Sequence, residues 1–193
     1  MSTKDFKAEL VQNFAQFKGY EQHDAHEFTT SLLDLMSKEL NRVKVKPKYS
    51  ELKISTRSSI SDQAEKWINH FKEREDSHIS DYFQGQQMTE LKCSKCSNVS
   101  YSFDACMFIH LDLSDSKSKV VTIDDLVKGM TEPETIDDYK CGKCKKKANH
   151  KKTHYMYTAP KILIVQIKRF KMGYYSSKKI LTDVELDNSL QFV

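Results

Sequence analysis

The stretch CSKCSNVSYSFDACMFIHLDLS, residues 93–114, contains the two features that decide the fold. From Val99 to Leu113 apolar and aromatic residues occupy every odd position, whereas the even positions are mostly polar. An alternation with a period of two predicts a long strand with one buried face. Because Cys106 and Phe108 interrupt the polar side, we expect this strand to bend or bulge near its middle.

The same stretch opens with a cysteine pair, Cys93 and Cys96, and the segment YKCGKCKKK supplies a second pair, Cys141 and Cys144. A Cys-x-x-Cys turn brings two thiolates to one side of the chain, and two such knuckles can complete a tetrahedral zinc site. Small residues such as Gly142 permit the tight turns. With four protein ligands the zinc ion would be structural, because no coordination position stays open for catalysis. Unligated cysteines or a redox pair are the alternative.

The bulk composition is that of a soluble globular protein, with 38% hydrophobic and 30% charged residues and a net charge of +4. No stretch approaches the roughly 20 apolar residues of a membrane span. The start, MSTKDFKAEL, lacks the apolar run of a secretory signal. Five cysteines without a signal favour a reducing compartment, the cytoplasm or nucleus. The fifth, Cys106, has no local base or helix terminus to activate it, so we interpret it as a packing residue.

Helical patterns dominate the first part of the chain. Residues 1–43 are predicted to be helical, with Asp24 as an N-cap and Glu27 completing a capping-box pattern. Pro47 ends any helix, and residues 44–60 are expected to be an extended connection. A second helix follows, capped by Ser61 or Asp62, with one apolar face formed by Ala64, Trp67, Ile68 and Phe71.

The later part adds strands and one short helix. The segment TIDDLVKGM predicts a helix capped by Thr122, and KILIVQIKRF, residues 161–170, is apolar enough for a central strand. Helices followed by strands indicate the α+β class.

Three segments resemble the ubiquitin-specific proteases, a family of papain-like cysteine deubiquitinases. GYEQHDAHEFTTSLLDLMSKEL, residues 19–40, is similar to the family's Gln-Gln-Asp-Ala-x-Glu-Phe box, with His23 in place of the second Gln. SHISDYFQGQQMTELKCSKCSNVSYSFDACMFIHLDL, residues 77–113, resembles the block that leads into the first knuckle. YKCGKCKKKANHKKTHYMYTAPKILIVQIKRF, residues 139–170, resembles the second knuckle and the strand that ends in Lys-Arg-Phe.

The resemblance implies a hand-like fold that cradles ubiquitin or a ubiquitinated protein. Residues 1–76 would form thumb helices, residues 77–160 zinc-binding fingers and residues 161–193 palm strands. Gln22 and Asp24 would lie near the cleft for the extended ubiquitin tail, where a carboxylate can pair with an arginine of that tail.

Four histidines are weaker candidates for substrate binding or zinc ligation. His23 and His26 flank Asp24, and as surface or packing residues they need no contact with substrate. His150 and His154 follow the second knuckle and would be at most substitute zinc ligands.

The family's chemistry is thiolate attack on the carbonyl after the last glycine of ubiquitin, with a histidine base. No cysteine precedes Gln22, and no histidine lies in the family's Gly-His-Tyr context, so we expect this chain alone to be inactive. It would be the central part of a deubiquitinase, with the missing parts elsewhere in a longer chain or on another chain, or a non-catalytic ubiquitin-binding relative.

A cluster of lysines around the second knuckle leaves a third alternative, a basic zinc module that binds nucleic acid through phosphates. This reading is less favoured, because aromatic residues are not interleaved with the lysines. The cluster comprises Lys140, Lys143, Lys145, Lys146, Lys147, Lys151 and Lys152.

Overall fold

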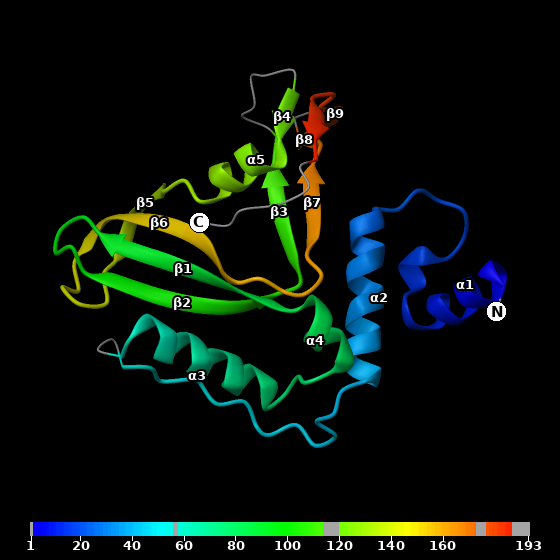
Figure 1. Cartoon of the computed structure of the whole chain (residues 1–193), viewed down its shortest axis with the longest axis horizontal. Coiled ribbons are helices and arrows are strands. Elements are labelled where there is room, and N and C mark those ends of the chain that lie inside the picture. Colours follow the sequence, from blue (N-terminus) through cyan, green and yellow to red (C-terminus); the bar gives the residue numbers. More distant parts are fainter. Residues whose placement is uncertain (1, 56–57, 114–119, 173–176, 187–193) are drawn as a thin grey trace.

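A computed structural model describes residues 2–55, 58–113, 120–172 and 177–186 and confirms the α+β class (Figure 1). The helices are α1 (Thr3–Asn13), the 3-10 turn η1 (Ala15–Phe17), α2 (Ala25–Glu39), α3 (Ile60–Lys72), α4 (His78–Phe83) and α5 (Ile123–Met130). The strands are β1 (Gly85–Cys93), β2 (Val99–Cys106), β3 (Phe108–Asp112), β4 (Val120–Thr122), β5 (Glu134–Lys140), β6 (Lys147–Thr158), β7 (Ile164–Lys168), β8 (Phe170–Met172), β9 (Ser177–Lys179) and β10 (Asp183–Glu185). In the described residues, no helix has the length and apolar character needed to cross a membrane.

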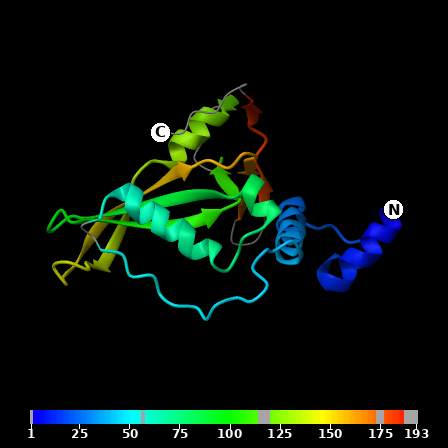
Figure 2. The same cartoon turned by 60° about the horizontal axis from the view of Figure 1, so that its bottom comes forward.

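The largest sheet is antiparallel, in the order β2-β1-β6-β5, and extends away from the N-terminal helices (Figure 1). We call this sheet the fingers and call residues 93–98 and 141–147, at its far end, the tip. Helix α3 lies along one face (Figure 2), where the side chain of Gln86 donates a hydrogen bond to the carbonyl of Ala64. Phe103 of β2 is fully buried on the sheet.

The long strand predicted from Val99 is divided at Met107, so the expected bend near its middle is confirmed. The prediction of a single strand is wrong, because the two halves belong to different sheets. β2 pairs with β1 in the fingers, whereas β3 pairs in parallel with β7. The buried odd-numbered residues of β3 join α5 in the main core, which includes Ile109, Leu111, Leu113 and Val127.

Strand β7 is shorter than the predicted span 161–170. In the part of the chain that the structure describes, its only strand neighbour is β3, so the expectation of a central strand is not met there. The described residues also contain two further strand pairs: β4 with β10 in parallel, and the antiparallel β8 and β9.

The N-terminal helical region is interrupted, which corrects the prediction of helix over residues 1–43. Gly19 adopts a left-handed φ of 90° in the connection between η1 and α2. The Asp24 cap is confirmed, since its carboxylate accepts from the backbone N–H of His26 at 2.6 Å. The bond goes to His26, so Glu27 does not complete the expected capping box.

The caps of the two later helices agree only in part with prediction. Helix α3 is capped by Ser59 rather than by Ser61 or Asp62, and its hydroxyl accepts from the N–H of Asp62 at 3.0 Å. Thr122 caps α5 as predicted, and the carboxylate of Asp125 returns a reciprocal bond.

A charged cluster and a close backbone approach hold the elements in place. Arg42, beyond the end of α2, pairs with Asp76 and Asp81 near α4. Gly85, at the start of β1, packs so closely against the end of β6 that a Cβ atom there would lie 2.6 Å from the carbonyl oxygen of Thr158.

The boundaries predicted between thumb, fingers and palm, at residues 76 and 160, remain predictions.

Candidate functional site

The four predicted metal ligands, Cys93, Cys96, Cys141 and Cys144, come together at the tip. Their Sγ atoms all lie within 4.8 Å of one another. Cys93 and Cys141 are buried, and the Sγ atoms of Cys96 and Cys141 are 3.7 Å apart. Thiolates at about 2.3 Å from a tetrahedral zinc ion would be separated by about 3.8 Å, so the cluster fits the ion.

Two knuckles of equivalent construction produce this cluster. In the first, Ser97 donates its N–H to the carbonyl of Cys93 at 3.0 Å; in the second, Lys145 donates to the carbonyl of Cys141, also at 3.0 Å. Ser97 and Lys145 both adopt left-handed backbone conformations, with φ of 53° and 59°. The turns therefore close through these residues and not through a left-handed Gly142, the small residue singled out in the sequence.

The thiols of the cluster have very different proton affinities. Backbone N–H groups of Cys144 and Lys143 lower the pKa of Cys141 to about 5. The backbone N–H of Asn98 also lowers the pKa of Cys96, but burial and hydrogen bonds with the other thiols outweigh it and raise this pKa to about 11. A bound divalent cation favours the thiolate form of every ligand.

His150 lies next to the cysteine cluster and contacts Cys141, although it is outside the four-ligand group. It is buried and lies directly across from Cys93 in the β1–β6 pairing. Its Nδ1 donates to the carbonyl of Ala148 at 2.9 Å, and its ring contributes to the lowered pKa of Cys141. His154 lies away from the tip and hydrogen-bonds Thr89. Neither histidine belongs to the four-cysteine group.

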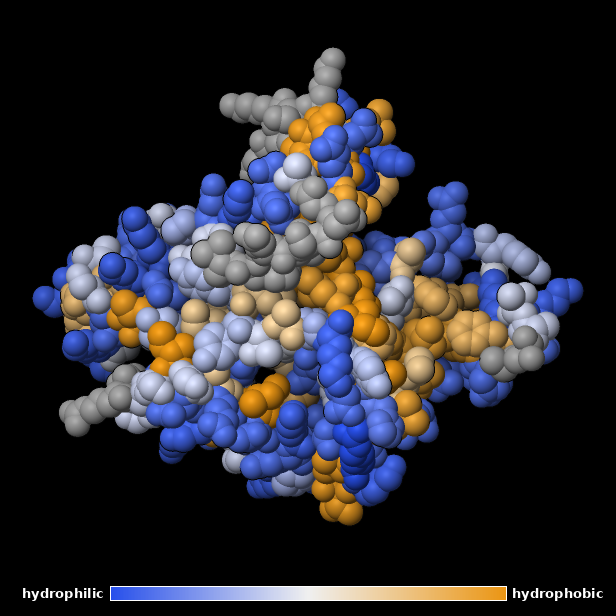
Figure 3. Space-filling model, in the orientation of Figure 1, coloured by the Kyte–Doolittle hydropathy of each residue, from blue (hydrophilic) through white to orange (hydrophobic). Residues whose placement is uncertain are grey.

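A second group of polar residues lies at the junction between α2 and β3. The His26 ring packs edge-on against Phe108 and His110, with centroid distances of 4.8 and 5.2 Å. His110 donates from Nδ1 to Oε1 of Gln166 on β7 at 2.6 Å. Figure 3 shows apolar residues exposed between β7 and α2 beside this junction.

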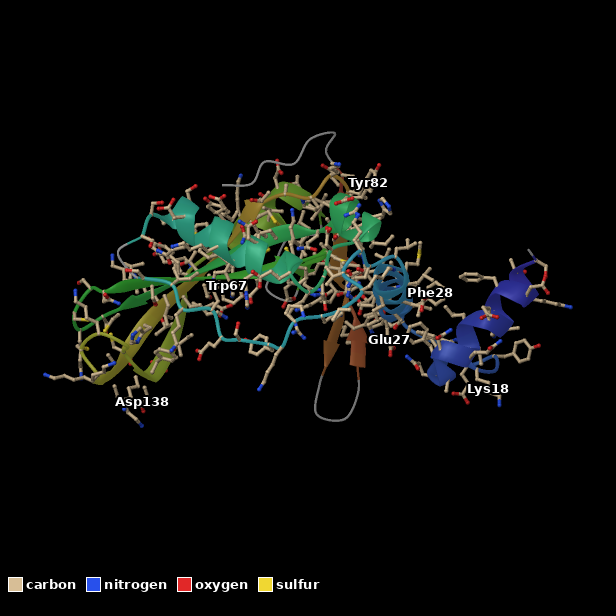
Figure 4. All side chains as sticks on the ribbon, turned by 90° about the horizontal axis from the view of Figure 1, so that it is seen from below. Lys18, Glu27, Phe28, Trp67, Tyr82 and Asp138 are labelled. Carbon is tan, nitrogen blue, oxygen red and sulfur yellow. The ribbon has the colours of Figure 1, made fainter. Side chains whose placement is uncertain are left out.

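The predicted substrate-binding residues precede this junction. Gln22 and Asp24 are exposed in the connection that enters α2. His23 packs edge-on against Phe17, which also packs against Phe28, the residue labelled in Figure 4 on the side of α2 that faces the N-terminal segment. His23 is therefore a packing residue, whereas His26 joins α2 to β3.

Beyond the junction lies a cavity of about 590 Å³. It opens between β3, α5 and the inner end of the fingers, and it is predominantly acidic. The ionisable residues in its lining are Asp112, Asp125, Glu132, Glu134, Lys168, His110 and His154. Hydrogen bonds from Thr122 lower the pKa of Asp125. We call this space the acidic cavity.

Cys106, the only cysteine outside the tip, has the character of a packing thiol. Burial is the main cause of its raised pKa, and the Asp104 charge adds to it. All seven histidines lie in the described residues, and none of them hydrogen-bonds Cys106. Cys106 therefore has no histidine partner that could activate it.

Sequence comparisons give a consistent relationship. The family model "Ubiquitin carboxyl-terminal hydrolase" matches residues 1–192. Ubiquitin carboxyl-terminal hydrolase 2 of Gallus gallus is 32% identical over 187 residues, which cover 95% of this chain and 52% of the relative. The Homo sapiens protein of the same name is 31% identical and is covered over 31% of its length. The chain thus spans about half or less of these relatives.

Comparisons of structure support the same fold. A SAGA Ubp8/Sgf11/Sus1/Sgf73 DUB module bound to monoubiquitin matches with a TM-score of 0.66 and 21% identity, over 95% of this chain and 36% of that chain. The module bound to ubiquitin aldehyde matches with a TM-score of 0.64 and 20% identity, over 97% and 38% of the two chains. The match of the family model over residues 1–192 shows that the chain belongs to the ubiquitin carboxyl-terminal hydrolase family and is of the ubiquitin-specific protease type.

Proposed function

We propose that the chain is the ubiquitin-binding central part of a cysteine deubiquitinase, an enzyme that cleaves the bond after the C-terminal glycine of ubiquitin. The family match over nearly the whole chain carries this proposal. The longer relatives are named as ubiquitin carboxyl-terminal hydrolases, and two similar structures are titled as bound to monoubiquitin or to ubiquitin aldehyde.

The acidic cavity and Asp24 support a specific mode of binding. Asp24 caps the N-terminus of α2. Two residues further along the chain, His26 contacts Phe108 and His110, which also line the acidic cavity. The carboxylates of Asp24 and of the acidic cavity attract a basic peptide, and an arginine can form a bidentate hydrogen-bonded pair with a carboxylate. Gln22 and Asp24 would hold the arginine-containing tail of ubiquitin at the entrance.

In this proposal the tip binds a structural zinc ion through its four cysteines. The ion supplies no chemistry in the cleavage; it fixes the two knuckles and so orders the end of the fingers. None of the five cysteines forms a disulfide, which is consistent with a reducing location, and we propose this location to be the cytoplasm or nucleus.

We further propose that these 193 residues do not cleave ubiquitin by themselves, because Cys106 is protonated and has no histidine base. A non-catalytic ubiquitin-binding role is the second candidate, and it rests on the same observation. The nucleophile and base of a complete enzyme would come from residues outside this sequence.

Calorimetric titration of the zinc-loaded chain with monoubiquitin tests the binding. Asp24→Asn is the informative variant, because Asn caps a helix as well as Asp but carries no charge. Asp34→Asn is the matched control, since it removes one exposed charge from the same helix without touching the entrance. We expect Asp24→Asn to weaken binding about tenfold, as expected for loss of a charge-assisted hydrogen bond, and Asp34→Asn to bind like the wild type.

Equal affinities of the two variants would reject the tail-binding role of Asp24. Absence of binding by a chain whose circular dichroism shows it to be folded would reject the ubiquitin-binding function. Release of a fluorophore from a ubiquitin C-terminal amide, abolished in Cys106→Ser, would contradict the proposed inactivity.

A further inference from the structure

Lysines gather on one face of the fingers near the tip. Lys92 of β1 is the direct cross-strand partner of Lys151 of β6, and Lys140 of β5 is the partner of Lys147 of β6. Directly paired residues of antiparallel strands point to the same side of a sheet, as do residues an even number apart along one strand. These four lysines therefore share one face, which we call the basic face.

The basic face is on the opposite side of the sheet from the acidic cavity. Lys92 has the same parity along β1 as Met88, the cross-strand partner of Phe103, so it shares the face on which α3 packs. Gln87 has the other parity and lines the acidic cavity. The basic face is thus separate from the proposed ubiquitin-tail site.

A second cavity, of about 360 Å³, opens on the basic face beside the first knuckle. Its rim consists of six exposed polar side chains, and its floor of the buried residues Cys93 and His150. The rim residues are Lys92, Ser94, Ser97, Thr135, Asn149 and Lys151. Each carries at least one hydrogen-bond donor, and none is acidic.

The rim side chains have no partner within the described structure. None of the six makes a side-chain hydrogen bond or ion pair with another described residue. Like charges directly opposite each other destabilise an antiparallel pair, so the Lys92–Lys151 pairing is unfavourable in the free protein. By contrast Lys152, on the other face, lies directly across from Glu134. Asp138, which Figure 4 labels near the outer end of the fingers, is not among the rim residues.

We propose that this second cavity binds a phosphomonoester group. A phosphomonoester carries close to two negative charges at neutral pH and three acceptor oxygens. Two ammonium groups match that charge, and the hydroxyls of Ser94, Ser97 and Thr135 with the Asn149 amide supply neutral donors. A single carboxylate would leave one lysine without a counter-charge. The group is carried by a phosphorylated protein side chain or by a small phosphorylated molecule.

Fluorescence anisotropy with the full zinc-loaded chain tests the proposal. The probe is a labelled peptide with one phosphoserine among neutral residues, and the same peptide without phosphate is the reference. We expect binding of the phosphorylated peptide only, weakened about tenfold in Lys92→Gln and in Lys151→Gln, through loss of a charge-assisted hydrogen bond. Lys152→Gln is the matched control, because it removes the same charge from the adjacent residue on the opposite face, and it should bind like the wild type.

Competition with inorganic phosphate distinguishes the two sources. Displacement of the peptide at an equal concentration identifies the phosphate group alone as the ligand, whereas a tenfold or greater preference for the peptide identifies a protein segment. Both results support the cavity as a phosphomonoester site.

Three results would overturn the proposal. The first is equal binding by the Lys151→Gln and Lys152→Gln variants. The second is binding of a single-stranded oligonucleotide in the absence of phosphopeptide binding, which would assign the face to nucleic acid. The third is loss of zinc from the Lys92→Gln and Lys151→Gln variants with unchanged phosphopeptide binding, which would mean that the lysines only neutralise the thiolates.

Discussion

Removal of the proposed zinc ion is expected to disorder the tip while the main core around β3 and α5 stays folded. The two knuckles order thirteen residues, 93–98 and 141–147, at a conformational cost of about 1.5 kcal/mol each, or about 20 kcal/mol. The buried cluster there contains only Ala148 besides the cysteines, and its burial contributes about 1 kcal/mol. The four backbone hydrogen bonds within the knuckles contribute about 1 kcal/mol each.

The protein chain alone therefore offsets only about a quarter of the ordering cost. A structural zinc ion contributes about 10–16 kcal/mol, which closes most of the difference. The main core shares no residue with the tip cluster, so its stability does not depend on the metal.

Hydrogen–deuterium exchange with and without EDTA measures this effect. The amides of Ser97 and Lys145, which donate within the knuckles, should lose protection after chelation, whereas those of Leu111 and Val127 should keep it. Cys141→Ser should behave like the chelated protein. Cys106→Ser is the control and should retain both zinc and protection. Persistent protection of the knuckle amides, with zinc loss verified by mass spectrometry, would refute the reasoning.

The other predictions concern packing and charge. Gly85→Ala should lower the free energy of unfolding by about 1–3 kcal/mol through overpacking, because its Cβ would meet a backbone oxygen; Gly129→Ala, in an open position on α5, should raise it by about 0.5–1 kcal/mol. Urea denaturation measures both, and equal effects would contradict the packing argument. A hydrogen bond from Arg42 lowers the pKa of Asp81 below 3.8. The Arg42–Asp81 pair therefore stabilises the fold above about pH 4. Its contribution to stability is lost as the pH falls through the lowered pKa. Asp81→Asn should therefore lose less stability than the wild type between about pH 5 and pH 3, as measured by urea denaturation at each pH; an identical acid dependence would argue against the pair.

From the sequence, the positions of helices and strands could be predicted better than the pairing of the strands. The alternation from Val99 to Leu113 identified strand conformation correctly, but it has the same form on both sides of Met107. Where the chain changes sheets depends on which strands pack beside it, and that information is not local. The cap of α3 shows a similar limit, because Ser59, Ser61 and Asp62 are all good N-caps and only packing of the helix on the fingers selects the first.

The clustering of the four cysteines was predictable because each cysteine pair is a local motif. His150 was not, since its position behind the cluster arises from pairing between β1 and β6. The acidic cavity was missed for the same reason. Its carboxylates come from several elements, and residues such as Asp112 and Glu134 become neighbours only when the strands are assembled.

The division of the long strand at Met107 has a mechanical consequence. β2 has eight residues, which at about 3.3 Å per residue make an arm of about 26 Å. With that arm length, a rotation of about 10° at Met107 would displace the tip by about 5 Å while hardly moving β3. Small angular adjustments at this end of the fingers would therefore be magnified at the tip.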